Sequence, residues 1–166
     1  MFSLLLSLLT FHPAQEYIQG VQLNTSVEYV GKNLVLTGAG LGTHKVGVIY
    51  VKVAVNQFFS EHPDNFVRTE SGAMGSIESV GTKVMSITFV RTVGASQVRN
   101  NIDQIISANL TDEEYPKYKA DIERVLSVIT SVGTVFVGDT INIIENDGEL
   151  FFIDPKGTEI EITLDN

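Results

Sequence analysis

The chain of 166 residues contains no cysteine. This absence excludes a disulfide framework, a thiol nucleophile and a thiolate metal site. Histidine is nearly as scarce, because His12, His44 and His62 are the only three, and they fall in unrelated segments without the spacing of metal ligands. We therefore expect neither a metal site nor a cofactor.

Basic residues are few and scattered. Eleven Lys and Arg stand against twenty Asp and Glu, which gives a formal net charge of -9, and no basic stripe interrupts this balance. Because an acidic surface repels phosphate groups, nucleic acids and anionic membrane surfaces are predicted to be poor partners. No stretch of the sequence is long and apolar enough to predict a transmembrane helix.

Motifs of several enzyme classes are missing as well. No serine lies in a G-x-S-x-G context, and the acidic residues show no paired spacing typical of glycosidases. Gly38, Gly40 and Gly42 superficially look like a phosphate-binding loop. The third glycine of a dinucleotide fingerprint is misplaced, however, and the run leads into a strand where a helix would be needed. Composition and spacing alone therefore indicate a soluble domain without an assigned chemistry.

The N-terminus is apolar. Its first residues, MFSLLLSLLTF, are too few to span a bilayer but enough for the core of a signal peptide. No Lys or Arg precedes the run, and His12 interrupts the small-residue pattern expected before a cleavage after Ala14. Residues 1–14 are therefore either a signal peptide of a secreted or periplasmic protein, or an apolar segment packed on a soluble intracellular one. Residues 15–166 are predicted to form one domain, since 43% of the chain is hydrophobic.

The stretch Leu34–Val55 is expected to organise the sheet. A strand ends at Thr37, and the three glycines that follow predict a sharp reversal or a bulge before the next strand. From Val46 to Val55 the side chains alternate with period two. One face is apolar and the other mixed, and the mixed face carries Tyr50 and Lys52. This alternation predicts that Tyr50 lies on the floor of a pocket.

The remaining segments change from strands to helices and back. A strand is predicted over Val21–Val30, a long loop or a short helix around Pro63–Phe66 within residues 60–82, and a strand over Val84–Arg91. Two amphipathic helices follow, with apolar stripes at Val98, Ile102, Ile105, Ile106 and Leu110, and at Tyr115, Tyr118, Ile122, Val125, Leu126 and Ile129. Four short strands are predicted over Thr134–Val137, Thr140–Ile144, Glu149–Ile153 and Thr158–Leu164. This order predicts an α+β domain with one antiparallel sheet and helices on one face.

The succession of several segments resembles the chalcone isomerase-like family. These segments are Gly20-Val21, LVLTGAGL from Leu34, a strand containing Tyr50, ITFVRTVGASQV from Ile87, SANLTDEEY ending at Tyr115, GDTINI from Gly138, and Gly157-Thr158. The resemblance covers Val21 to about Thr163. It implies an open-faced sandwich, in which a layer of helices covers a large antiparallel sheet. Members of the family close a chalcone into a flavanone, bind fatty acids without catalysis, or are bacterial proteins of mostly unassigned role.

The resemblance also implies positions for the site. The catalytic branch uses an Arg after the glycine turn, a Thr on the next strand, and a Tyr, a Lys and an Asn from the second helix and its start. These positions fall, in that order, on Gly42, Tyr50, Tyr115, Tyr118 and Ile122. Only Tyr115 retains the family residue as a catalytic candidate. All five are predicted to contact a small hydrophobic ligand instead.

These departures favour a protein that does not catalyse the reaction. Losing one fixed donor to a developing oxyanion costs roughly 10²-fold or more in rate, and here three donors are replaced. We expect a binder of a fatty acid or a flavonoid-like molecule in a cleft between sheet and helices. The alternatives are a structural or partner-binding domain without a ligand, and an active chalcone-flavanone isomerase, an intramolecular lyase.

The family's final helical segment has no counterpart in the sequence. The chain is therefore predicted to be a fragment or a shortened variant. Apolar surface left uncovered by that segment would favour a ligand or a second subunit, and thus a homo-oligomer.

Overall fold

A seven-stranded antiparallel sheet forms the centre of the computed structural model, which describes residues 16–111, 113 and 115–164. Residues 1–14, expected to be a signal peptide or a packed apolar segment, lie outside the described residues. The strands are β3 (Ser26–Tyr29), β4 (Lys32–Val46), β5 (Ile49–Ser60), β6 (Lys83–Phe89), β7 (Thr140–Asn146), β8 (Glu149–Ile153) and β9 (Glu159–Ile162). They lie in the sheet in this same order, so each strand pairs with its neighbour in the chain. A separate short pair, β1 (Tyr17–Ile18) and β2 (Val21–Gln22), precedes them.

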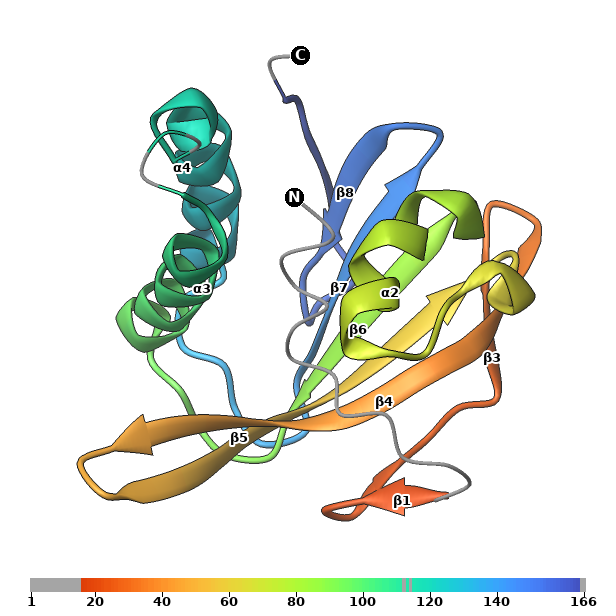
Figure 1. The fold of residues 1–166 in the computed structure, drawn as a ribbon. Coiled ribbons are helices and arrows are strands. Elements are labelled where there is room, and N and C mark those ends of the chain that lie inside the picture. The colour runs from red at the N-terminus through yellow and green to blue at the C-terminus, as the bar shows by residue number, and fades with distance from the viewer. Residues whose placement is uncertain (1–15, 112, 114, 165–166) are drawn as a thin grey trace.

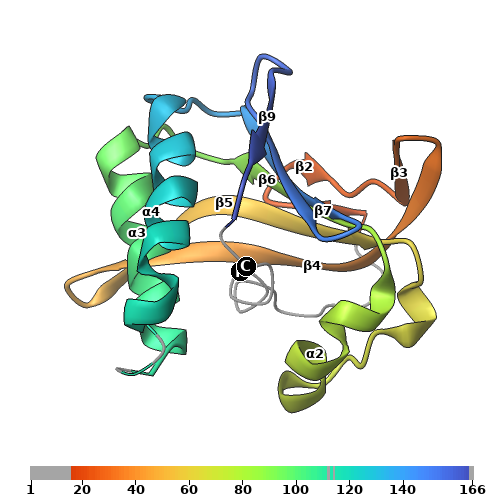
Figure 2. The ribbon, with the colours of Figure 1, turned by 90° about the horizontal axis from the view of Figure 1, so that it is seen from above.

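The helices cover one face of this sheet, which confirms the predicted α+β open-faced sandwich (Figures 1 and 2). Two short 3-10 turns and a helix follow β5: η2 (Pro63–Asn65), α2 (Glu70–Ser76) and η3 (Ile77–Val80). Helices α3 (Ala95–Asn109) and α4 (Tyr115–Ser131) follow β6 and pack on each other. In both views α2 lies away from the α3–α4 pair. No helix in the described part of the chain is long and apolar enough to cross a membrane.

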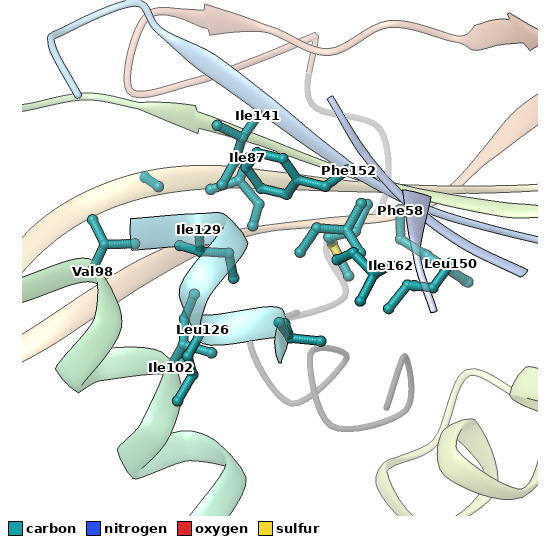
Figure 3. Packing of buried hydrophobic residues seen from close by; sticks show 14 of the residues in the cluster. Phe58, Ile87, Val98, Ile102, Leu126, Ile129, Ile141, Leu150, Phe152 and Ile162 are labelled. Carbon is teal, nitrogen blue, oxygen red and sulfur yellow. The ribbon is translucent and has the colours of Figure 1, made fainter. Parts of the chain in front are cut away.

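The main core lies between the sheet and both groups of helices. The predicted stripes place Leu126 and Ile129 of α4 against Val98 and Ile102 of α3, because residues three and four apart share one side of a helix (Figure 3). The sheet contributes Phe58, Met85, Ile87, Ile141, Ile143, Leu150 and Phe152 to the same cluster. Residues of α2 and η3, among them Ile77, complete it.

The opposite face of the sheet carries a smaller apolar cluster. Its buried members are Leu34, Phe59, Val84 and Ile144. Two residues before Phe59 on β5, the buried Gln57 side chain points to the same face. Its Oε1 accepts the Asn24 N–H at 2.8 Å and so attaches the segment after β2 to the sheet. The β1–β2 pair is thereby attached to the sheet on the side opposite to the helices.

The β4–β5 hairpin corrects the interpretation of the glycine run. Gly38, Gly40 and Gly42 lie within β4, and the chain reverses later, at Gly47-Val48, where Gly47 has a φ of +61°. The predicted sharp reversal at the glycines is wrong, whereas the predicted bulge is present. Register shifts occur between Leu36 and Gly38 and between Gly42 and Thr43.

The second bulge changes which side chains face the helices. Gly42 pairs with Ala54 and Thr43 with Lys52, so Val53 is an extra residue on β5. An extra residue shifts the period-two pattern by one. Ala54 therefore belongs to the main core and Val53 also packs against it, although the two are adjacent. The uninterrupted alternation predicted from Val46 to Val55 is wrong for this reason.

Among the other segments, the four predicted strands from β6 to β9 are confirmed, whereas three predictions elsewhere in the chain are wrong. β6, β7, β8 and β9 coincide with predicted strands to within a few residues. Thr134–Val137 is not a strand, because only Val135 makes a bridge, to Val93. Val21–Val30 is broken into β2 and β3, and α2 was not foreseen in the polar segment after β5.

A polar network ties the ends of β4, β5, β6 and β7 together. The Lys32 Nζ donates to Thr82 Oγ1 at 2.7 Å and to Asn146 Oδ1 at 3.2 Å, and pairs with Glu61 Oε2 at 3.3 Å. The pKa of Glu61 lies below its ordinary value, chiefly because the carboxylate accepts the Thr82 backbone N–H, with Lys32 adding to the effect. The network therefore stabilises the charged form of Glu61.

Candidate functional site

A small pocket lies between the outer part of the β4–β5 hairpin and α3. Its volume is about 80 Å³. We call it the hairpin pocket, and it is lined by the β4–β5 hairpin, the segment after β6 and α3. Its lining residues are His44, Val46, Val51, Val53, Arg91, Val93, Gln97 and Asn101. Four of these are valines and four are polar, so the pocket combines an apolar wall with hydrogen-bonding groups.

The apolar wall is continuous with the interior of the protein. Val93 belongs to the main core cluster and Val53 packs against the same cluster. Val46 lies farther out on the hairpin and is 57% exposed. The hairpin pocket therefore leads from solvent towards the space between sheet and helices.

The polar side of the pocket carries positive charge. Arg91 is exposed, and its guanidinium has no hydrogen bond or ion pair with another residue in the described ranges. Gln97 lies in the first turn of α3, where the helix dipole favours a negative group, and Asn101 lies one turn later. An exposed guanidinium can hold a carboxylate through two parallel hydrogen bonds. The pocket is therefore suited to a carboxylate attached to an apolar chain.

Local backbone contacts fix the positions of these walls. The bulge lets the Val53 carbonyl accept the Val90 N–H at 3.0 Å, which attaches the segment after β6 to the hairpin. Val93 and Val135 then exchange two backbone hydrogen bonds of 2.9 and 3.0 Å. Arg91 is thereby held between two anchored residues at the mouth of the pocket.

Two of the five predicted site residues lie together on α4. Tyr115 begins the helix and is half-buried, and its hydroxyl donates to Asp103 Oδ1 at 3.3 Å. Ile122 lies two turns later and is completely buried in the main core. Tyr115 packs against the same cluster. Both side chains therefore face the interior between α4 and the sheet, and neither lines the hairpin pocket.

The other three predicted residues are dispersed. Tyr50 is 66% exposed and lies next to Val51 on β5, so it points to the face opposite to the hairpin pocket. The expectation that Tyr50 forms a cleft floor is wrong, because the turn at Gly47-Val48 places it near the outer end of the hairpin. Tyr118 is half exposed on α4.

Gly42 lies in the middle of β4. A Cβ added there would come within 3.2 Å of Asn56 Nδ2 and 3.4 Å of the Ala54 carbonyl oxygen. A larger side chain at this position is therefore crowded by β5. The five predicted residues do not converge on one site in the described structure.

The residues of the hairpin pocket were missed because no motif marks them. Arg91 stands within the segment that carries the family resemblance, yet only its position beside the hairpin gives it a role. One signal was available in the sequence. Arg91 is a charged residue in the short loop between a strongly apolar strand and a helix, and such loops commonly carry binding residues.

Two other features of the described chain are less suited to a ligand. No group of His, Asp and Glu among the described residues could hold a metal ion. A wider surface groove of about 640 Å³ lies between α4 and β9, but two of its three charged side chains, Glu123 and Arg124, are already occupied. Arg124 contacts Asp121 at 2.9 Å and the Thr163 carbonyl at 3.2 Å, and Glu123 pairs with Arg99.

Comparison with known proteins relates this architecture to one group of folds. No protein-family model matches the sequence, and no curated protein matches it. Among solved structures, the chain is similar to the fatty-acid binding protein AtFAP1 of Arabidopsis thaliana, with a TM-score of 0.59 and 13% sequence identity. The alignment covers 91% of this chain and 79% of AtFAP1. The similarity is one of architecture, and the chain therefore has a chalcone isomerase-like fold.

Proposed function

We propose that the protein is a non-catalytic binder of a fatty acid or a similar carboxylate with an apolar chain. The observation that carries this proposal is the hairpin pocket, where Arg91 stands at the mouth of a valine-lined wall. The fold shared with a fatty-acid binding protein supports the same reading. The ligand's carboxylate would bind at Arg91, and its chain would lie against Val51, Val53 and Val93.

The size of the pocket sets how the ligand is held. Ligand sites usually enclose about 300–1,000 Å³, so a volume of about 80 Å³ holds the carboxylate and only the first part of a chain. The rest of the chain would pass between the sheet and the helices beyond Val53 and Val93, where packed core side chains would have to move apart to admit it. Tyr115 and Ile122 are proposed to contact this inner part. Roles for Gly42, Tyr50 and Tyr118 as ligand contacts stay predictions.

Arg91→Gln provides the direct test, with a fluorescent long-chain fatty acid as the probe. A charge-assisted hydrogen bond contributes about 1.5–3 kcal/mol, and the lower value applies to an exposed guanidinium. We expect the dissociation constant to rise about tenfold. The matched control is Arg68→Gln, which removes the same charge from an exposed residue between η2 and α2, away from the pocket. Equal losses in both variants, or none in either, would contradict the proposed site.

Two further measurements separate this function from its alternatives. Native mass spectrometry after mild purification should show a mass increment of a fatty acid, and a clean mass that also fails to take up added fatty acid would favour a partner-binding domain. Incubation with a chalcone should leave its long-wavelength absorbance unchanged beyond the uncatalysed rate. Clear turnover would instead establish an isomerase, and the binding role would then be that of a substrate site.

A further inference from the structure

The outer end of the β4–β5 hairpin is an exposed apolar surface. Val46, Val48, Ile49 and Tyr50 are 57%, 92%, 64% and 66% exposed, and only Gly47 interrupts them in the chain. We call residues 46–50 the hairpin tip. In Figures 1 and 2 it reaches past α3, away from the centre of the sheet. Single exposed apolar residues are common, but a contiguous projecting group marks an interaction site.

The hairpin is also locally basic within an acidic protein. From Lys32 to Ser60 the sequence contains three lysines and one histidine but no Asp or Glu. Lys45 and Lys52 flank the hairpin tip, and Lys45 Nζ lies 5.8 Å from the centroid of the Tyr50 ring. Glu28 and Glu61, the acidic residues on either side of this stretch, lie at the opposite end of the strands.

We propose that the hairpin tip inserts into the surface of an anionic phospholipid bilayer. The apolar side chains would enter the boundary between headgroups and acyl chains, Tyr50 would lie at headgroup level, and Lys45 and Lys52 would contact lipid phosphates. The net charge of -9 does not prevent this contact, because charges more than about 8 Å away are largely screened at physiological salt. The expectation drawn from net charge alone is thus replaced by the local charge of the hairpin.

Charge favours this occupant over a second copy of the chain. Two hairpin tips in contact would bring two pairs of lysines together, and no carboxylate within the hairpin could neutralise them. Anionic lipid supplies the opposite charge and an apolar layer at once. His44, Val46 and Val51 line the hairpin pocket on the same hairpin, so insertion would bring the pocket close to the lipid. The bilayer contact itself needs no bound ligand and is tested without one.

The test is co-sedimentation of the purified full-length protein with vesicles. One set contains phosphatidylcholine alone and another contains roughly 30% phosphatidylserine, which models an anionic leaflet. We expect binding to the anionic vesicles that weakens with added salt. Val48→Glu should lower the partition coefficient at least tenfold, because it places a carboxylate at the most exposed apolar position. Lys45→Gln and Lys52→Gln should each lower it by about fivefold.

The matched control is Val30→Glu. Val30 is 74% exposed in the turn between β3 and β4, at the other end of β4, so the same substitution there should change vesicle binding less than twofold. Circular dichroism should show that both variants keep the fold, since neither valine is in the core.

Three outcomes would overturn the proposal. The first is that the wild-type protein fails to bind anionic vesicles. The second is that Val48→Glu, like the Val30→Glu control, binds them as the wild type does, which would assign the binding to another part of the chain. The third is a wild-type dimer in sedimentation velocity that Val48→Glu dissociates without a loss of vesicle binding. That result would make the hairpin tip a contact between copies of this chain. Loss of vesicle binding with unchanged fatty-acid affinity would support the proposal and leave the proposed ligand unaffected.

Discussion

Ile122→Asn tests whether the second helix presents its interior side to a polar site or to a packed core. The family resemblance places an Asn at this position, whereas the structure places Ile122 in the core with no exposed surface. An isoleucine lining a solvated cleft could be replaced by Asn at little cost. A core isoleucine could not, because the amide would be buried without partners.

The expected loss can be worked from these contacts. Truncating a buried isoleucine typically costs about 2–5 kcal/mol, and burying an unpaired polar group adds about 1–3 kcal/mol. We expect the free energy of unfolding to fall by about 4 kcal/mol or more. For a chain of this size, each kcal/mol lowers the Tm by about 2–4 °C, so the Tm should fall by about 8–16 °C.

Urea and thermal unfolding followed by circular dichroism measure this loss. Ile122→Val, which removes one methylene group and adds no polar atom, should cost about 0.5–1.5 kcal/mol. Tyr118→Asn, one turn earlier on the half-exposed side of α4, should change stability by less than Ile122→Asn does. If Ile122→Asn melts within about 3 °C of the wild type, the side chain does not pack as the structure has it.

Two further predictions concern polar contacts. Glu61→Gln should lower the Tm at pH 7, because the lowered pKa of Glu61 reflects contacts of its carboxylate with Thr82 and Lys32. This contribution is fully present above the pKa of Glu61 in the unfolded chain and disappears as the pH falls through the lower folded pKa. The difference in Tm between the two proteins should therefore begin to shrink below about pH 4, and a constant difference down to pH 3 would contradict the prediction. Tyr115→Phe should cost no more than about 1.5 kcal/mol, because its half-buried hydroxyl makes a long contact of 3.3 Å with Asp103. A Tm loss well above about 6 °C in differential scanning calorimetry would show a stronger hydroxyl bond.

The fold was predictable where one periodicity continued over a whole element. The apolar stripe through Ile122, Leu126 and Ile129 identifies both α4 and the side that it buries. β6 and β8 are likewise short apolar segments between clear breaks, and β8 has the predicted bounds. In these elements, local pattern and tertiary burial require the same residues to face the core.

The candidate site was not predictable in the same way. Its residues come from β4, β5, the segment after β6, and α3, and they meet only because the strands pair with a particular register. Tyr50 illustrates the difficulty. The prediction that Tyr50 and Val51 face opposite sides of β5 is correct. The sequence does not show where the hairpin turns, however, and Tyr50, which lies near the outer end of the hairpin, was therefore predicted to lie on the floor of a pocket.

The extra residue at Val53 links the wall of the hairpin pocket to the position of Arg91. Gly42 already pairs with Ala54 and Thr43 with Lys52, so deleting Val53 would join these pairs in unbroken alternation and leave Lys52 and Val51 on their present faces. The deletion would remove one valine from the pocket wall together with the carbonyl that accepts the Val90 N–H. A one-codon deletion would thus take away part of the apolar wall and the support of the neighbouring Arg91 at once, while the hairpin tip kept its present orientation.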